Sequence, residues 1–92
     1  MKEINGIFID NASHGYLKVS MNDFKAVIDD PSVISGYSGI EDGHVFLEED
    51  CDAGVFINAV SDKGFRFSHT NKYDETYRCP KNYCASIVEY GY

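Results

Sequence analysis

Residues 44–62 read HVFLEEDCDAGVFINAVSD, and this stretch decides the fold. Its beginning, His44-Val45-Phe46-Leu47, is apolar and β-prone and predicts a strand. Asp50 can then cap a helix that runs to about Ser61, because a carboxylate at a helix N-terminus accepts its free backbone N–H groups. The apolar stripe of this helix consists of Val55, Phe56, Ala59 and Val60. A strand followed by an amphipathic helix indicates a sheet with a helix packed on its face.

The residues before this stretch predict a hairpin and a first helix. Ile7-Phe8-Ile9 and Tyr16-Leu17-Lys18-Val19 are short β-prone runs, and the polar turn residues 11–15 lie between them. Ser20 and Asp23 have the spacing of a capping box, so a helix is expected to begin there. Its end is expected at Asp29-Asp30-Pro31, since proline disfavours helix at the residue before it.

Three further strands complete the prediction. Val33-Ile34-Ser35 is expected to be extended and to form a second hairpin with residues 44–47. After a helix stop at Lys63-Gly64, Phe65–His69 alternates as a half-exposed strand does, and Ala85–Tyr90 is expected to close the sheet. The predicted class is therefore α+β, one domain over residues 1–92. Its order is strand-strand-helix-strand-strand-helix-strand-strand, with a small antiparallel sheet and two helices on one face.

The charges divide the chain into unequal parts. Between Lys25 and Lys63 there is no Lys or Arg, yet nine of the 15 carboxylates fall there, and the net charge is -7. Such a balance argues against direct binding of nucleic acid or of an anionic membrane, since both require clustered Lys and Arg. It favours a basic protein cleft as partner. The alternative is that these residues only keep a small domain soluble. The predicted partner-binding residues are Asp29, Asp30, Glu41, Asp42, Glu48, Glu49, Asp50 and Asp52, and Asp62 completes the nine.

No pattern of catalytic or metal-ligating residues emerges, so the sequence predicts neither an enzyme nor a cofactor. The run from Glu48 to Gly54 lacks the ligand alternation of a calcium loop, and helix capping explains its carboxylates better. Asp50 and Asp52 would oppose a thiolate at Cys51, which we expect to be a buried structural thiol. Cys79 and Cys84 are separated by four residues and complete a zinc set only by arbitrary additions.

The three cysteines, Cys51, Cys79 and Cys84, are expected to be reduced, because an odd, irregularly spaced set is no disulfide framework. With no apolar run of membrane length and no signal peptide at the N-terminus, the cytoplasm is the expected location. Five tyrosines crowd the last twenty residues, namely Tyr73, Tyr77, Tyr83, Tyr90 and Tyr92. They are expected either at a protein interface or along the edges of the sheet.

Several of these segments resemble a group of small acidic proteins carried by bacteriophages and plasmids, for which no activity is known. The resemblance rests on residues 14–19 (HGYLKV), 34–38 (ISGYS) and 45–53 (VFLEEDCDA), and more weakly on 69–72. The LEEDCD run is its most specific part, and after Lys72 the chain departs from the pattern. The resemblance implies a mobile-element setting, in which small acidic proteins often inhibit host defence proteins or host enzymes.

Two functions are therefore expected. The preferred one is an inhibitor whose acidic face, centred on residues 41–52, occupies the basic cleft of a host nuclease or CRISPR effector, in the manner of a DNA mimic. The second is a non-catalytic accessory or structural protein, with a homodimer formed through sheet edges or through the tyrosine-rich end.

Overall fold

The computed structural model describes residues 2–92 and confirms the α+β class. Five strands form one mixed sheet in the order β3-β4-β2-β1-β5. The strands are β1 (Glu3–Asp10), β2 (Gly15–Ser20), β3 (Gly39–Glu41), β4 (His44–Glu48) and β5 (Arg66–Tyr73). The predicted hairpin of the first two strands and the predicted strand at residues 44–47 are confirmed, within a residue or a few at their ends.

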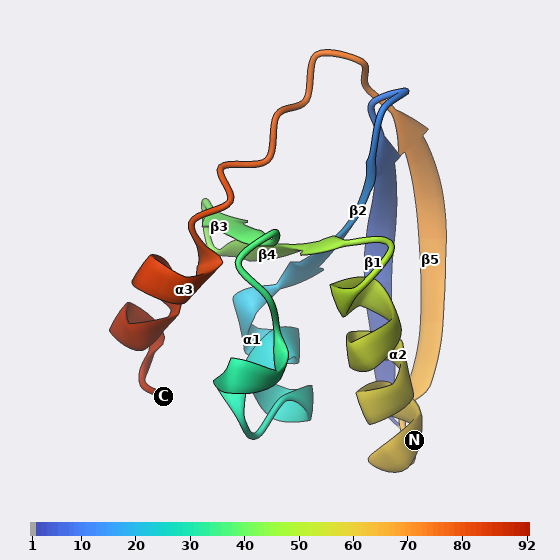
Figure 1. Ribbon diagram of the computed structural model, residues 1–92. Coiled ribbons are helices and arrows are strands. Elements are labelled where there is room, and N and C mark those ends of the chain that lie inside the picture. The colour runs from blue at the N-terminus through green and yellow to red at the C-terminus, as the bar shows by residue number, and fades with distance from the viewer. Residues whose placement is uncertain (1) are drawn as a thin grey trace.

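Two helices, α1 (Met21–Val27) and α2 (Asp52–Asp62), cover one face of the sheet, as predicted (Figure 1). Ser20 begins α1, and its Oγ accepts the Asp23 backbone N–H at 3.1 Å, which confirms this half of the predicted capping box. The predicted stop of α2 is also confirmed, because the Lys63 N–H donates to the Ala59 carbonyl and Gly64 follows at φ 75°.

The sheet is not purely antiparallel, and this part of the prediction is wrong. β5 pairs in parallel with β1, with Glu3 opposite Arg66 and Asp10 opposite Tyr73. The reason lies in α2, which carries the chain across the sheet face between β4 and β5. A helical crossover of that length lets β5 run in the same direction as β4. Because β1 and β4 are both antiparallel to β2, β5 also runs in the same direction as β1.

The expected strand at Val33-Ile34-Ser35 is also wrong, because Pro31–Val33 forms a short 3-10 helix, η1. The Asp30 carboxylate accepts hydrogen bonds from both the backbone N–H and the hydroxyl of Ser32, at 3.0 and 2.7 Å, and so stabilises this turn. The strand that pairs with β4 lies further along the chain, at β3.

The last predicted strand is helical instead. Residues Tyr83–Ser86 form α3, and Ile87–Tyr90 form a second 3-10 helix, η2. Tyr83 and Ile87 lie four residues apart and are both buried. Val88, the residue after Ile87, is 68% exposed. That spacing places two apolar side chains on one helical face, which competes with the alternation of a strand.

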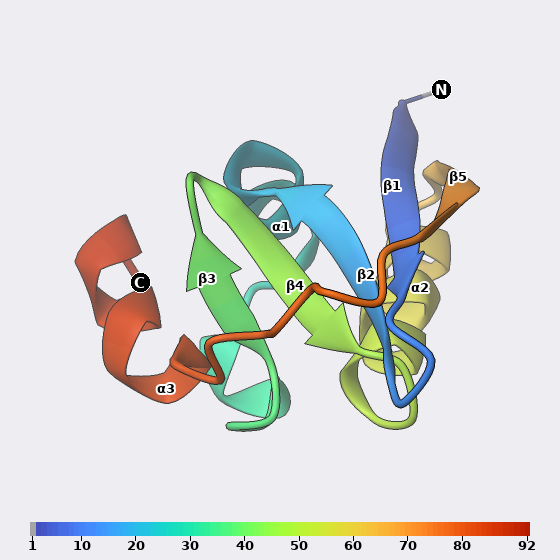
Figure 2. The same cartoon turned by 90° about the horizontal axis from the view of Figure 1, so that it is seen from above.

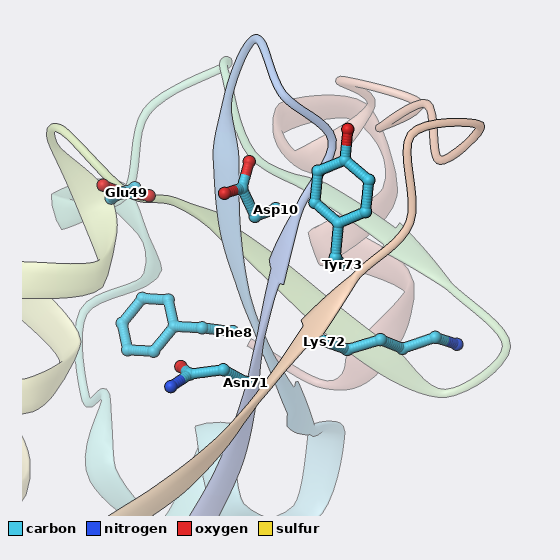
Figure 3. Close-up of a pocket in the computed structure, with 6 residues that line it drawn as sticks. All are labelled: Phe8, Asp10, Glu49, Asn71, Lys72 and Tyr73. Atoms are coloured by element: carbon cyan, nitrogen blue, oxygen red, sulfur yellow. The ribbon is translucent and has the colours of Figure 1, made fainter.

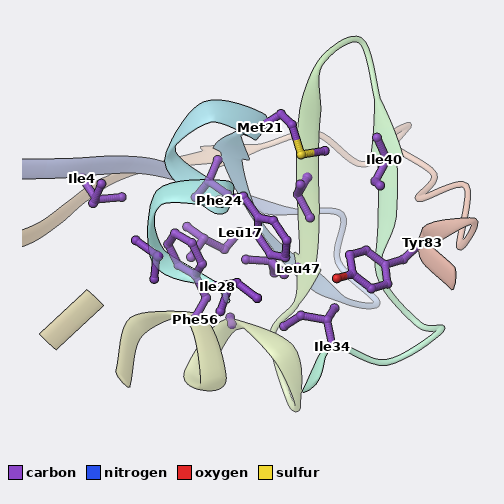
Figure 4. Close-up of a cluster of buried hydrophobic side chains, with 14 of the residues drawn as sticks. Ile4, Leu17, Met21, Phe24, Ile28, Ile34, Ile40, Leu47, Phe56 and Tyr83 are labelled. Atoms are coloured by element: carbon purple, nitrogen blue, oxygen red, sulfur yellow. The ribbon is translucent and has the colours of Figure 1, made fainter. Parts of the chain in front are cut away.

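Two groups of apolar side chains hold the sheet from its two faces. The larger lies between the sheet and the helices, where Phe24 stacks on Phe56 at 6.0 Å and Tyr83 reaches in from α3 (Figure 4). The smaller lies on the opposite face, over Tyr16 and Phe46. The segment between β5 and α3 crosses this second face (Figure 2). Its Tyr77 packs against both rings.

Candidate functional site

The nine carboxylates of the acidic stretch lie at three separate places. Asp29, Asp30 and Asp62 surround one shallow cavity between the end of α1 and α2. Glu41 and Asp42 lie at the tight turn between β3 and β4. The remaining four follow in the connection from β4 to α2, at the other end of β4, which at five residues is about 17 Å long. The expectation of one continuous acidic face is corrected accordingly.

Asp52 belongs to the interior, so its predicted place on a partner-binding surface is wrong. Its side chain is 2% exposed. One carboxylate oxygen accepts the backbone N–H of Ser35 at 3.0 Å, while the other accepts the hydroxyls of Ser35 and Ser38 at 2.6 and 2.5 Å. Distances this short are typical of charge-assisted hydrogen bonds. Asp52 therefore ties the loop before β3 to the first turn of α2.

Glu48 is also largely buried and helps to form the same connection. Its backbone N–H donates to the Ser38 hydroxyl at 3.0 Å, and its carboxylate accepts the Cys51 N–H at 3.0 Å. The predicted helix cap at Asp50 is wrong, because Cys51 occupies the cap position of α2 and Asp50 is exposed. In place of a side-chain cap on α2, Glu48 accepts the N–H of the cap residue itself.

Two of the predicted residues are engaged in local contacts elsewhere. The Lys63 ammonium group lies 2.9 Å from the Asp29 carboxylate, which forms an ion pair between α2 and the end of α1. Asp30 caps η1 through Ser32, and these hydrogen bonds lower the pKa of its carboxyl group. Four residues of the predicted set are exposed and form neither an ion pair nor a capping hydrogen bond with any residue that the structure describes. They are Glu41, Asp42, Glu49 and Asp50.

A cavity of about 270 Å³ lies beside the connection from β4 to α2 and is the candidate binding site. Three segments that are far apart in the sequence meet there, namely the start of β2, the loop before β3 and the acidic run itself. A fourth contribution comes from the C-terminal segment, which the sequence did not associate with these three. The lining residues are His14, Tyr16, Tyr37, Glu48, Asp50, Cys51 and Lys81.

A backbone hydrogen bond joins the start of β2 to the acidic run. The Glu49 N–H donates to the Gly15 carbonyl at 2.9 Å. A Cβ atom on Gly15 would lie 1.6 Å from a carboxylate oxygen of Glu49, so a larger residue here would displace the Glu49 side chain. The side chain of Glu49 therefore lies over the first residue of β2, and it lines a different cavity, on the helix side of the sheet.

The aromatic wall of the cavity has one rigid and one exposed ring. Tyr16 is 2% exposed and packs edge-on against Tyr77 at 5.6 Å. Burial, followed by the negative charges near Cys79 and Glu48, raises the pKa of the Tyr16 phenol, which keeps it protonated. Tyr37 is 62% exposed and forms the outer rim. Carboxylates next to tyrosine rings favour the binding of a cationic group.

Cys51 lines the cavity but lacks the character of a nucleophile. The expectation that it is buried is wrong, since the residue is exposed. Partial loss of hydration, with the charges of Glu48, Asp52 and Asp50, raises the pKa of its thiol, as predicted for a thiol among carboxylates. All three cysteines are free.

We therefore expect Cys51 to react slowly with iodoacetamide near neutral pH in spite of its exposure, because only the thiolate is reactive. Replacing Asp50 with asparagine should speed the reaction about threefold, since one negative charge is removed. Peptide mapping of the labelled protein over a pH series measures this. The control is Asp42→Asn, which removes a charge at the far end of β4. A thiol that titrates below the ordinary value of 9.0 would contradict the expectation.

A second cavity, of about 610 Å³, lies on the helix side of the sheet near the ends of β1 and β5. Figure 3 shows that Phe8 and Asn71 point to the same side as Glu49, whereas Lys72 points away. Sequence reasoning missed this cavity because it depends on the parallel pairing of β1 and β5, which places Phe8 beside Asn71.

Within residues 2–92, no three or more His, Cys, Asp or Glu side chains are grouped as metal ligands. None of the helices in that range has the length and apolar character needed to cross a membrane. The chain matches no protein-family model, no curated protein and no solved structure. The assignment of function therefore rests on the geometry of the site.

Proposed function

We propose that this chain is a small protein-binding protein, encoded by a mobile element, that inhibits a host defence or nucleic-acid-processing protein in the cytoplasm. Its acidic side chains would occupy a basic cleft of a nuclease or CRISPR effector. The observation that carries the proposal is the position of Asp50, which is exposed and lines the cavity walled by Tyr16 and Tyr37. The exposed Glu49 precedes it in the same connection.

This site is suited to a lysine or arginine side chain of the partner. The exposed carboxylates supply charge-assisted acceptors, and the tyrosine faces attract cations by their quadrupole. Tyr16 is held by packing and Asp50 lies within the turn closed by the hydrogen bond from the Cys51 N–H to Glu48, so little ordering is required when a ligand binds. Lys81 borders the cavity and would have to turn aside from an incoming basic side chain.

The other acidic residues would act at longer range. With a net charge of -7, the whole chain attracts a basic cleft and repels nucleic acid. Glu41 and Asp42 lie too far from the cavity to contact the same basic side chain, so we assign them to steering. Steering raises the rate of encounter more than it strengthens the final complex.

The alternative function, a non-catalytic accessory protein that forms a homodimer, is favoured by a different observation. The edge strand β5 is exposed over nearly its whole length. The two functions are compatible, because this edge and the cavity lined by Tyr16 and Asp50 involve different residues.

The experiment compares two double variants that each remove two charges with little change of shape. Glu49→Gln with Asp50→Asn neutralises the two exposed carboxylates of the connection from β4 to α2, and Glu41→Gln with Asp42→Asn is the matched control at the opposite end of β4. Purified host nucleases and CRISPR effectors are assayed for DNA cleavage with increasing amounts of each protein. The wild type and the control should inhibit one of them at stoichiometric concentrations, and the site variant at least about tenfold less well.

Equal inhibition by the two double variants would overturn the assignment of the site. If the wild-type protein inhibits none of the enzymes, the inhibitor function itself is contradicted. Neither variant alters Asp52 or Glu48, so the hydrogen bonds that hold the connection from β4 to α2 are preserved.

A further inference from the structure

The two edges of the sheet differ in how their backbone groups are satisfied. At the β3 edge, the Asn82 side chain accepts the Ile40 N–H at 2.7 Å and donates to the Ile40 carbonyl at 3.1 Å. The Tyr83 N–H donates to the Ser38 carbonyl nearby. The opposite edge is formed by β5 (Figure 1). This strand is eight residues long and exposed at every position except the half-buried Phe67. A long open edge is a template for another strand.

The hydrogen bonds to β1 show which backbone groups of β5 are free. The Arg66 N–H donates to the Lys2 carbonyl, and the Asp74 N–H donates to the Asp10 carbonyl. Since successive residues of a strand point their backbone groups to opposite sides, the even-numbered residues of β5 face β1. The N–H and C=O groups that point outward are therefore those of Phe67, His69, Asn71 and Tyr73.

We propose that β5 pairs antiparallel with β5 of a second copy of this chain, about a two-fold axis at Thr70. The two five-stranded sheets would then form one continuous sheet. A two-fold axis perpendicular to the sheet keeps the helices of both copies on the same face, and an isologous contact of this kind closes as a dimer. The outward backbone groups would exchange hydrogen bonds in pairs, with His69 opposite Asn71 and Phe67 opposite Tyr73.

The side chains favour this register over its neighbours. With the axis at Thr70, Arg66 of one copy lies opposite Asp74 of the other, and an aromatic pair forms at each end of the strand. Opposite charges and aromatic pairs across strands are stabilising. Moving the axis to His69 would place Arg66 opposite Lys72, which are like charges. Moving it to Asn71 would place Phe67 opposite the exposed Glu75 and lose both aromatic pairs.

The cavity near the ends of β1 and β5 gives a second reason. Its lining includes Phe8 of β1 together with Asn71 and Tyr73 of the edge strand β5, so the cavity extends to that strand (Figure 3). In the proposed register, Phe67 of the second copy lies opposite Tyr73 on that same side. Its ring would enter the cavity and cover Phe8, which is only partly buried in the single chain.

The test uses complementary charges at the axis. Sedimentation equilibrium at micromolar concentrations should give the wild type twice the 10.3 kDa of one chain. Thr70→Lys and Thr70→Glu should each be monomeric, because identical charges then face each other across the axis. Mixing the two variants should restore the dimer. In the proposed register, residue 70 of one chain lies opposite residue 70 of the other, so a Lys on one chain meets a Glu on its partner. Asn22→Lys, on the exposed side of α1, is the matched control and should remain dimeric.

A monomeric wild type would overturn the proposal, as would a Thr70→Lys variant that dimerises like the wild type. Hydrogen exchange on the wild-type protein gives a result that does not depend on the folding of a variant. The outward amides of His69 and Asn71 should be protected from exchange, and rapid exchange of both would equally overturn the proposal. The inhibitor assay measures DNA cleavage by another protein and sedimentation measures self-association of the wild type, so failure of either proposal is distinguishable from failure of the other.

Discussion

Replacing Asp52 with alanine is expected to lower the free energy of unfolding by about 3–5 kcal/mol, which is a large part of the stability of a small domain. The carboxylate is buried and accepts hydrogen bonds from Ser35 and Ser38. Without it, donors in the interior lose their acceptor and cannot all reach water. Urea denaturation followed by circular dichroism measures the change.

The control for this variant is Asp50→Ala, two residues away and exposed, which should leave the midpoint of unfolding nearly unchanged. If Asp52→Ala does not fold, Ser38→Ala serves as a milder probe, since it removes one donor to Asp52 and the acceptor of the Glu48 N–H. Equal unfolding midpoints for Asp50→Ala and Asp52→Ala would show that the buried carboxylate does not hold these segments together.

Replacing Tyr83 with alanine is expected to cost about 3–5 kcal/mol and to release the C-terminal segment. The ring is 1% exposed and packs edge-on against Phe24 at 6.0 Å. Its hydroxyl donates to the Pro31 carbonyl at 2.7 Å, so the same side chain also fixes η1. The variant should unfold at lower urea concentration and should be cleaved by trypsin after Arg78 or Lys81 much faster than the wild type.

The conservative variant separates packing from hydrogen bonding. Tyr83→Phe keeps the ring and loses only the bond to Pro31, so its cost should be about 1 kcal/mol. A cost for Tyr83→Phe as large as that for Tyr83→Ala would mean that the hydroxyl, and not the ring, holds the segment. No change in the rate of cleavage in Tyr83→Ala would contradict the role of the ring altogether.

The elements that the sequence predicted well are those whose signals are local. The cap of α1 at Ser20 and the glycine stop of α2 at Gly64 depend on neighbouring residues only. The same holds for the hairpin of β1 and β2. In contrast, the helical end of the chain depends on the burial of Tyr83 and Ile87 in the core, which the sequence of residues 85–90 alone did not reveal.

The candidate site could be predicted only in part. The sequence singled out the acidic run and the motif around Ser35, but it treated every carboxylate as exposed. Composition does not distinguish Asp52, which binds two serines in the interior, from Asp50, which faces solvent. The cavity itself joins residues from distant segments, and no short-range pattern places Tyr16 beside Glu48.

The open edge at β5 was partly anticipated, since a homodimer through sheet edges was one of the expectations. The sequence could not identify which edge is free, because that depends on the parallel pairing of β1 and β5 and on the cap that Asn82 provides at β3. Both features arise from contacts between residues more than forty positions apart in the chain.

The central claim is that the cavity lined by Tyr16, Tyr37 and Asp50 recognises basic side chains, and nuclear magnetic resonance tests it most directly. The ¹⁵N-labelled protein is titrated with a short arginine-rich peptide as the probe. The backbone amides of His14–Tyr16, Tyr37 and Glu49–Cys51 are predicted to shift together, and the shifts should vanish in the Glu49→Gln, Asp50→Asn variant. Shifts of equal size at the turn around Asp42, or none at the cavity, would contradict the claim.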